Sequence, residues 1–344
     1  MLLVVNCGSS SVKLVAFDGA LAEVARSSVD RIGAGGPAGH AEALAEGLAA
    51  MGLQPGALTA AAHRVVHGGA AFVAPCRVDA AVLAEIEACA ALAPLHNPAN
   101  LTGIRAVAAL APDLPQYASF DTAFHATNPD VAVTYALPEP ERARGLRRYG
   151  FHGLSFAAIV RKVKEISPYR VPDRLLAFHL GNGCSICAIR GGISVATTMG
   201  YSPLDGLTMG TRAGGLDPAV VMDLCDRLGV AGTSRLLNRE SGLLALGGAS
   251  DMRALHAAGT PNAAFAIDHF AYWAIRHAGS MIAAMSGLDA ISFTGGIGEN
   301  DAEMRARILD GLGWIAAGKP VHVIPADEER QIAMEARALR EAEG

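Results

Sequence analysis

Three glycine-rich turns in this sequence could bind phosphate groups. The first follows the apolar residues 2–5 and reads NCGSSSVK over residues 6–13. The other two read HLGNG over residues 179–183 and GGIGEN over residues 295–300. Backbone N–H groups, hydroxyls and an ammonium gathered in such turns suit anionic oxygens, although similar turns also close ordinary hairpins.

The first turn does not have the spacing of a P-loop. It lacks the GxxxxGK[ST] pattern, and the apolar residues 14–17 predict a second strand where a P-loop would open a helix. We therefore expect a β-hairpin at residues 2–18, with Lys13 near its tip. The 295–300 turn should instead follow a strand and precede a helix.

Cationic and acidic side chains gather in five motifs between these turns: HRVVHGG at 63–69, PLHNPAN at 94–100, FDTAFH at 120–125, YGFHG at 149–153 and MGTRAGGLDP at 209–218. Arg64 and Arg212 lie in segments read as glycine-rich turns, and a guanidinium there can grip a carboxylate or phosphoryl group through two hydrogen bonds. The alternative is a pair of surface arginines. Asp121 should end a strand at residues 117–120, and His152 is either a functional group or a structural hydrogen-bonding residue.

The composition limits the classes of function. A chain of 344 residues with 51% hydrophobic content predicts about two domains, and a net charge of -5 with 18% charged residues gives no basic face for nucleic acid or a membrane surface. The N-terminal apolar run is too short for a signal peptide or a membrane span. Six cysteines without paired spacing favour a reducing cytoplasm, and Cys184 and Cys187 are interpreted as packing residues.

Hydrophobic periodicity predicts two series of strands followed by helices. In the first, strands are expected at 2–6, 12–18, 24–29, 60–66 and 117–120, with helices at 39–51, 79–92 and 97–110. In the second, strands are expected at 174–180, 185–190, 192–197 and 290–294, with helices at 217–228, 233–239, 260–286, 301–312 and 326–342. Residues 138–148 should form an exposed loop. The pattern indicates two related α/β domains facing one another.

In their types and their order, the motifs closely resemble those of the acetokinase family, which comprises acetate kinase and its short-chain acyl relatives. The matching motifs extend from Asn6 to the segment 324–329. The resemblance implies the actin, Hsp70 and sugar kinase superfamily: an α/β fold of two duplicated actin-like ATPase (ribonuclease H-like) domains with an interdomain cleft. Residues 1–122 would form the N-terminal domain, with the helix 331–344 packing back on it. Residues 123–330 would form the nucleotide-binding and dimerisation domain of a cytoplasmic homodimer.

The resemblance also implies a reaction and its residues. ATP and a short carboxylate would give ADP and an acyl phosphate, reversibly, with Mg²⁺ or alternatively Mn²⁺. Arg64 would hold the substrate carboxylate, Arg212 would stabilise the transition state and His152 would donate to the phosphoryl group. Asp121 would orient either a metal-bound water or the attacking carboxylate. The metal ligands would be Asn6 and Glu328. The apolar substrate pocket would be formed by Val66, Leu95, Phe151 and Pro203. The ATP contacts would be Lys13, His179, Leu180, Gly181, Asn182, Gly183, Asp251, Met252, Arg253, Gly296, Ile297, Gly298, Glu299 and Asn300.

Several positions depart from the family pattern, namely Phe156, Gly215 and Asp327, where the family usually has histidine, aspartate and asparagine. The chain is also several tens of residues shorter than typical members. A kinase for propionate or butyrate, and a catalytically silent ATP-binding regulator, are the alternatives. For Asp251 and Arg253, a plain exposed charge pair is a further alternative.

Overall fold

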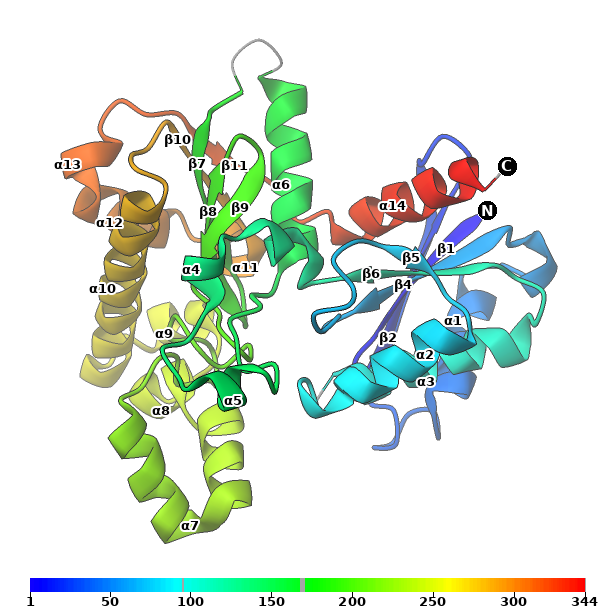
Figure 1. The fold of residues 1–344 in the computed structure, drawn as a ribbon, viewed down its shortest axis with the longest axis horizontal. Helices are drawn as coiled ribbons and strands as arrows, with labels where there is room; N and C mark the ends of the chain where they lie inside the picture. Colours follow the sequence, from blue (N-terminus) through cyan, green and yellow to red (C-terminus); the bar gives the residue numbers. More distant parts are fainter. Residues whose placement is uncertain (95, 168–170, 344) are drawn as a thin grey trace. The chain divides into compact units, whose positions relative to one another are not determined.

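The computed structural model describes residues 1–94, 96–167 and 171–343. These residues form two compact units. Unit 1 combines Met1–Phe124 with Asp327–Gly344, and unit 2 is His125–Ala326. Figure 1 follows the chain through both units.

Unit 1 is built on a six-stranded sheet with the order β3-β2-β1-β4-β6-β5. Its first hairpin is the expected one: Leu2 pairs with Phe17 and Asn6 with Lys13 in antiparallel register, and the Gly8 N–H donates to the Ser11 carbonyl at 2.8 Å. Strands β4 and β6 then add in parallel, which brings their carboxyl ends to the same edge as the end of β1. The strands are β1 (Leu2–Cys7), β2 (Ser11–Phe17), β3 (Glu23–Asp30), β4 (Ala60–Val65), β5 (Cys76–Arg77) and β6 (Gln116–Phe120).

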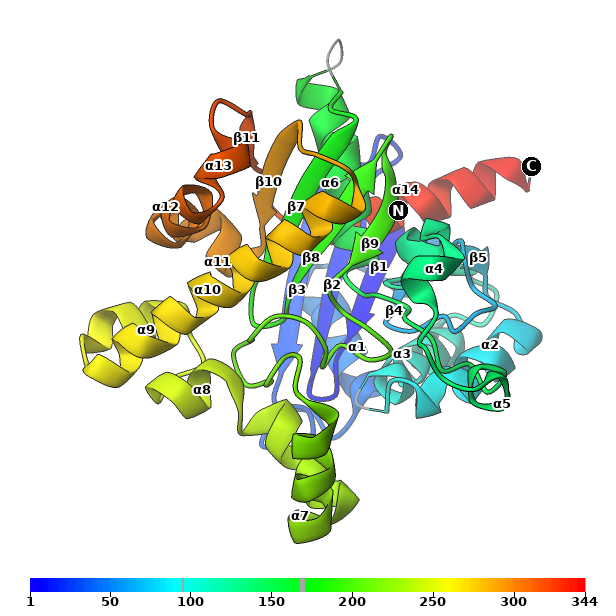
Figure 2. The same ribbon diagram turned by 60° about the vertical axis from the view of Figure 1, so that its left-hand side comes forward.

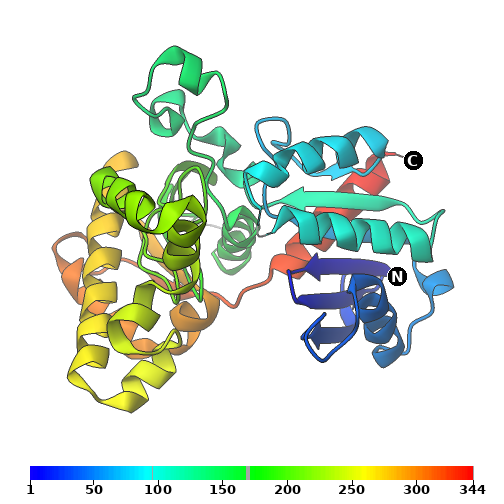
Figure 3. The same cartoon turned by 90° about the horizontal axis from the view of Figure 1, so that it is seen from below.

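Helices cover both faces of this sheet. Helices α1 (His40–Ala50) and α3 (Asn97–Leu110) pack on one face, where Leu3, Val5 and Leu14 join a buried core, and α2 (Ala80–Ala88) packs on α3. Helix α14 (Glu328–Ala342) packs on β1, β4 and β6, and Figures 1 and 3 show it returning to unit 1. Short 3-10 turns complete the series: η1 (Pro55–Ala57), η2 (Cys89–Ala91) and η3 (Ala123–Thr127).

Unit 2 repeats the strand order of unit 1. Its sheet runs β11-β10-β7-β8-β9, with β7, β8 and β9 antiparallel and β10 and β11 added in parallel. Read from β9, this is the order of β3, β2, β1, β4 and β6. The strands are β7 (Arg174–Leu180), β8 (Cys184–Arg190), β9 (Ile193–Thr197), β10 (Ala290–Thr294) and β11 (Val321–Val323). The duplicated α/β architecture expected from the sequence is therefore present.

Two long helices cover this second sheet. Figure 2 shows α10 (Pro261–Ala284) crossing one face, while α6 (Gly153–Ile166) lies against β7 and β10 on the other. Gly229 interrupts α7 with a positive φ of 70°, so its two halves correspond to the two helices expected there. The other helices are α4 (Asp130–Val133), α5 (Glu139–Arg142), α7 (Pro218–Arg239), α8 (Gly242–Gly247), α9 (Met252–Ala258), α11 (Gly295–Asn300), α12 (Ala302–Gly311) and α13 (Gly313–Ala316).

Several local predictions were wrong or incomplete, and the short elements β5, α4, α8, α9, α13 and β11 were not predicted. Helix α6 was missed, although its apolar residues recur at helical spacing. Residues 295–300 are not a turn before a helix but form helix α11 themselves, and the expected loop at 138–148 contains the one-turn helix α5. Arg64 lies in strand β4 and not in a glycine-rich turn. Leu95, expected to line the substrate pocket, lies outside the described residues.

Candidate active site

The carboxyl ends of β4 and β6 place an arginine and an aspartate side by side in unit 1. Arg64 pairs in register with Ser119, two residues before Asp121. Its Nε and NH2 atoms donate to the two carboxylate oxygens of Asp121 at 3.1 and 2.6 Å. Its NH1 atom lies 3.5 Å from Asn6 Oδ1, and Nε lies 3.9 Å from a carboxylate oxygen of Glu328. Four predicted site residues therefore meet at one edge of the sheet.

Because this cluster is buried, the pKa of each charged group in it depends on the charges of the others. Burial by itself would lower the pKa of Arg64, but the carboxylates of Asp121 and Glu328 outweigh it and raise that pKa. Burial raises the pKa of Glu328, and Arg64 and Lys13 oppose that rise. Lys13, whose backbone pairs with Asn6 across the hairpin, thus adds positive potential near Glu328. The guanidinium of Arg64 is neutralised within its own unit.

In unit 2, three predicted residues converge on the tip of the β7–β8 hairpin. A Cβ atom built on Gly183 would lie 3.3 Å from His152 Nε2 and 3.6 Å from the Arg212 NH1 atom. Glycine at position 183 therefore lets the imidazole, the guanidinium and the hairpin backbone lie close together. The same hairpin is tied to the segment carrying Arg212, because the Gly210 N–H donates to the Asn182 carbonyl at 3.1 Å.

His152 is held in an unusual backbone conformation just before helix α6. Its φ of 59° lies in the left-handed region, which non-glycine residues rarely adopt and which often marks a functional residue. Its Nδ1 atom lies 2.8 Å from Ser185 Oγ, and its ring stacks on His179 with a centroid distance of 4.1 Å. His179 is itself bound through Nδ1 to Ser155 Oγ at 2.8 Å. Two hydroxyls thus fix the orientation of both imidazoles.

Arg212 differs from Arg64 in lacking a carboxylate neighbour. Its NH1 atom lies 3.4 Å from the Pro203 carbonyl and 3.9 Å from the Met209 sulfur, and within the described ranges no acidic side chain pairs with it. Burial lowers the pKa of Arg212. A half-buried guanidinium whose charge is not compensated favours the arrival of an anion, because the anion would offset the cost of burying the cation.

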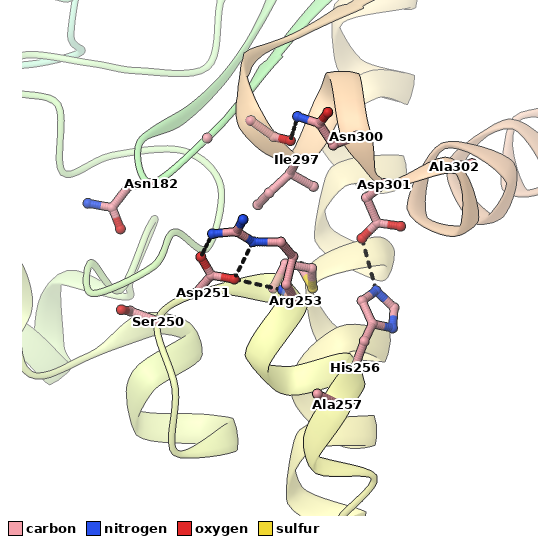
Figure 4. Close-up of a pocket in the computed structure, with 13 residues that line it drawn as sticks. Asn182, Ser250, Asp251, Arg253, His256, Ala257, Ile297, Asn300, Asp301 and Ala302 are labelled. Carbon is pink, nitrogen blue, oxygen red and sulfur yellow. Dashed lines mark hydrogen bonds and ion pairs between the residues drawn. The ribbon is translucent and has the colours of Figure 1, made fainter.

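A pocket of about 910 Å³ opens next to this hairpin within unit 2. Figure 4 shows side chains from the β7–β8 hairpin, from α9 and from the α11–α12 corner around it. The predicted ATP residues that line the pocket are Gly181, Asn182, Asp251, Met252, Arg253, Gly296, Ile297 and Asn300. Residues separated by more than 100 positions in the chain are therefore brought to one cavity large enough for a nucleotide.

Other predicted ATP residues do not line this pocket. His179, Leu180 and Gly183 lie on the hairpin itself, Lys13 belongs to unit 1, and Gly298 is buried in α11. Glu299 has a structural explanation, since one of its carboxylate oxygens accepts N–H bonds from Gly295 and Ala326 at 2.9 and 3.0 Å. The pocket-lining residues that sequence reasoning missed are Ser250, His256, Ala257, Asp301 and Ala302.

Two hydrogen-bonded side-chain pairs lie on the pocket wall. Arg253 binds Asp251 through Nε and NH2 at 3.2 and 2.8 Å, and Asp251 also accepts the N–H bonds that begin α9. Asp251 and Arg253 therefore do form an exposed pair. His256 Nε2 lies 2.9 Å from a carboxylate oxygen of Asp301, linking α9 to the start of α12 as Figure 4 shows. Asp301 gives a weak sequence signal, since an aspartate before a helix usually acts as an N-cap.

The predicted substrate-pocket residues belong to different units. Val66 is buried in unit 1, where its N–H donates to Asn100 Oδ1 at 3.1 Å. Phe151 is buried in unit 2, where its carbonyl lies 3.0 Å from His125 Nε2. Pro203 belongs to unit 2 as well and contacts Arg212 through its carbonyl.

The departures from the family pattern have local partners. Phe156 is fully buried and packs edge-on against His125 at 5.7 Å. The Gly215 N–H donates to the Gly206 carbonyl, and Asp327 lies 3.6 Å from the Arg330 guanidinium.

Cys184 and Cys187 are buried and form no disulfide, and burial raises the pKa of each thiol to about 12. Both cysteines are packing residues, as expected.

The donor set of unit 1 fits a hard divalent cation. Asn6, Asp121 and Glu328 offer amide and carboxylate oxygens, which Mg²⁺ prefers, and Mg²⁺ keeps several waters or phosphate oxygens in addition to few protein ligands. Among residues 1–94, 96–167 and 171–343, no group of three His, Cys, Asp or Glu side chains is placed to enclose a metal ion by itself. Over the same ranges, no helix combines the length and apolar character that crossing a membrane requires.

Comparison with known proteins agrees with this geometry. The sequence model of the acetokinase family matches residues 38–333. An acetate kinase of Nitrobacter hamburgensis is 42% identical over 386 aligned positions, covering 98% of this chain and 96% of that protein. An acetate kinase of Deinococcus deserti is 41% identical over 99% of this chain and 98% of its own length. Both alignments contain more positions than the 344 residues of this chain, so they include gaps in it. This agrees with the expectation that the chain is shorter than typical members.

Solved structures show the same fold over nearly the whole chain. The acetate kinase of Porphyromonas gingivalis matches with a TM-score of 0.89 and 34% identity, covering 98% of this chain and 99% of that one. A propionate kinase of Francisella tularensis matches with a TM-score of 0.90 and 36% identity, covering 97% and 98%. The predicted α/β fold of two duplicated actin-like domains is confirmed, and the chain belongs to the acetokinase family.

Proposed function

We propose that this protein catalyses reversible phosphoryl transfer from ATP to acetate, giving acetyl phosphate and ADP. The observation that carries the proposal is the uncompensated guanidinium of Arg212 beside His152 and the hairpin glycine Gly183. Phosphoryl transfer places negative charge on the equatorial oxygens of the moving group, so a site needs cations and N–H donors and no covalent nucleophile.

Unit 2 would bind the nucleotide. The pocket beside the hairpin would hold the adenosine between α9 and α11, and the backbone of Gly181 and Asn182 would direct the phosphates toward Arg212. Arg212 and His152 would then donate hydrogen bonds to the transferring phosphoryl group as its charge develops. Because these donors are already oriented by Pro203 and Ser185, little reorganisation is required at the moment of transfer.

Unit 1 would present the acceptor. Arg64 would hold the acetate carboxylate, and Asp121 would keep the guanidinium oriented through its two hydrogen bonds. Acetate is ionised at neutral pH, so its attack needs no general base. Asn6 and Glu328 would hold Mg²⁺, which supplies positive charge to the phosphate oxygens when bound; Mn²⁺ would satisfy the same donors.

Acetate is favoured over longer acids by the small apolar pocket proposed for its methyl group, to which Val66, Phe151 and Pro203 are assigned. Each added methylene changes binding in such a pocket by only about 1–3 kcal/mol. Propionate is the second candidate substrate, and the close structural match to a propionate kinase favours it over other acids.

The assembly and location also belong to this proposal. We expect a cytoplasmic homodimer that associates through the domain 123–330. Exposed aromatic side chains in unit 2 support the association, since Phe265, Tyr272 and Trp314 are 58%, 62% and 71% exposed in the single chain. Light scattering coupled to size-exclusion chromatography would give the mass in solution, and a monomer would contradict the dimer.

The test of the activity is the acyl phosphate trapped by hydroxylamine. Purified protein is incubated with Mg-ATP and acetate, propionate or butyrate, with and without EDTA. Strong product with acetate that EDTA abolishes is the expected result. Product from propionate alone would favour the second candidate, and ATP binding without product from any acid would contradict the kinase.

A further inference from the structure

The segment that carries Arg212 has no regular secondary structure of its own. Residues 198–212 run from the end of β9 to the arginine, and we call them the arginine loop. Arg212 donates to the Pro203 carbonyl within this loop at 3.4 Å, and the Met209 N–H donates to the Arg212 carbonyl at 3.2 Å. The position of the guanidinium therefore depends on where the middle of the loop, at Pro203, is held.

Arg148 crosses the arginine loop and binds it at two points. Its NH1 atom donates to the Thr198 carbonyl at the start of the loop and to a carboxylate oxygen of Asp205 near its middle, both at 3.0 Å. The other Asp205 oxygen accepts the Gly206 N–H at 2.8 Å. The pair is partly buried, with the two side chains 24% and 39% exposed. One guanidinium thus joins two loop positions that lie seven residues apart.

Tyr135 supports the same contacts. The Arg148 guanidinium lies 5.7 Å from the centroid of the Tyr135 ring, and the Tyr135 hydroxyl accepts the Tyr201 N–H at 3.0 Å. The packing is tight, because a Cβ atom on Gly200 would lie 2.6 Å from an Asp205 oxygen and 2.7 Å from the Tyr135 hydroxyl. A side chain at position 200 would force the Asp205 carboxylate and the Tyr135 hydroxyl to shift, so glycine there lets both groups lie against the loop.

We propose that Arg148 and Asp205 are positioning residues for phosphoryl transfer: their ion pair fixes Pro203 and, through its carbonyl, the guanidinium of Arg212. The inference rests on the proposed role of Arg212. Neither side chain is assigned contact with substrate, and the sequence pattern did not single out either of them. Their effect on the reaction is transmitted entirely through the backbone of the arginine loop.

The experiment compares two arginine–aspartate pairs of unit 2. Arg174 binds Asp289 through Nε and NH2 at 3.1 and 2.7 Å and the Ser286 carbonyl at 3.1 Å, which joins the starts of β7 and β10. Among the described residues, its hydrogen bonds go to these two partners and not to the arginine loop. Arg148→Met and Arg174→Met therefore remove similar pairs from the same unit. Stability of both variants is measured by thermal unfolding, and kcat and KM by trapped acetyl phosphate.

Arg148→Met should lower kcat by about 10- to 100-fold, with KM for ATP changed by less than about threefold. The reason is that the Arg212 guanidinium, a donor to the transition state, would be displaced by a fraction of an ångström. Arg174→Met should leave kcat within about twofold. Arg148→Lys should recover part of kcat, because an ammonium can still reach Asp205 but cannot reproduce the planar fork. Equal kcat in the two methionine variants would overturn the proposal.

Two further measurements keep the outcome decisive. If Arg148→Met does not fold, Asp205→Asn keeps the side-chain size and removes the charge; it should lower kcat by about fivefold or more, and an unchanged kcat would overturn the proposal. If the wild-type protein makes no acyl phosphate, the proposed function fails separately. In that case, stabilisation by inorganic phosphate should still require Arg212 and be weakened by Arg148→Met, and equal stabilisation of Arg148→Met and Arg174→Met would overturn the inference.

Discussion

The two units share a strand order, but the arginine of unit 1 is paired with a carboxylate and the arginine of unit 2 has none among the described residues. In unit 1, Arg64 is held by the two oxygens of Asp121 and lies near Glu328. In unit 2, Arg212 is half-buried beside the Pro203 carbonyl and the Met209 sulfur, and no acidic partner for it occurs in the described part of the chain. The duplicated sheet therefore fixes where a site forms but not its charge. The charge of Arg64 is compensated within unit 1, whereas no carboxylate among the described residues compensates the charge of Arg212.

The largest expected effect tests the neutralised arginine. Arg64→Ala should lower the free energy of unfolding by about 3 kcal/mol, because removing one member of a buried ion pair leaves its carboxylates uncompensated. Unfolding in urea, followed by circular dichroism, measures the loss. Arg212→Ala is the matched control, expected to cost less than about 1 kcal/mol because no carboxylate depends on it. Equal losses in the two variants would remove the contrast.

The converse effect should appear in catalysis. Arg212→Ala should lower kcat by about 10² or more, equivalent to about 2.7 kcal/mol, with little change in ATP binding. Steady-state trapping of acetyl phosphate gives kcat, and calorimetry gives the affinity for ATP. Arg227→Ala is a suitable control, because Arg227 pairs with Asp223 on the exposed surface of α7. Full activity of the Arg212 variant would exclude its proposed role.

Acid should affect both units through buried histidines, among them His63 in unit 1 and His125 in unit 2. Burial lowers the pKa of His63 in unit 1 and of His125 in unit 2 from the usual 6.5 to about 4. The unfolded chain binds each proton near pH 6.5 and the folded chain only near pH 4. Stability from each neutral imidazole is therefore complete above pH 6.5 and falls as the pH drops toward 4.

The substitution His63→Gln separates the two contributions. The new amide can still approach Gln116, which now lies 2.7 Å from His63 Nε2, and it does not titrate. Between pH 7 and pH 5 the variant should lose about 2 kcal/mol less stability than the wild type. Urea unfolding at the two pH values measures this difference. Parallel losses in wild type and variant would show that His63 does not titrate as its burial requires.

The smallest effect is expected on the pocket wall. Asp251→Asn removes the charge that faces Arg253 but keeps an oxygen able to accept the first N–H groups of α9. Because the pair is exposed to solvent, the thermal midpoint should not change measurably. KM for ATP should change by less than about threefold, and a larger change would give the pair a direct part in nucleotide binding.

The sequence predicted the sheets better than the connections. Short apolar runs broken by glycine and serine identified both hairpins, because strand periodicity and turn chemistry are local properties. Helix α6 was missed because it begins at Gly153 after a left-handed histidine and has no side-chain N-cap to announce it. Helix α11 was read as a turn because its first two residues are glycines, whose helix propensity is low and which tertiary packing overrides.

The site was predictable only where a motif carried it. Arg64, Asp121, His152 and Arg212 lie in distinctive short motifs, although their assigned roles stay predictions. The pairing of Arg148 with Asp205 spans 57 positions and has no characteristic spacing. His256 and Asp301 are 45 positions apart and meet only because α9 and α12 line the same pocket. Contacts of this kind depend on tertiary packing, which local patterns do not encode.

The return of α14 to unit 1 affects how the protein is made. Glu328 comes from this helix and faces Arg64, yet residues 125–326 of unit 2 separate the helix from the rest of its own unit. At about 5–20 residues per second, a ribosome needs roughly 10–40 s to synthesise that insertion. During this interval Arg64 and Asp121 lack their third charged neighbour, and the sheet face that α14 covers stays open. A nascent chain is therefore most exposed to aggregation and to chaperones on that face.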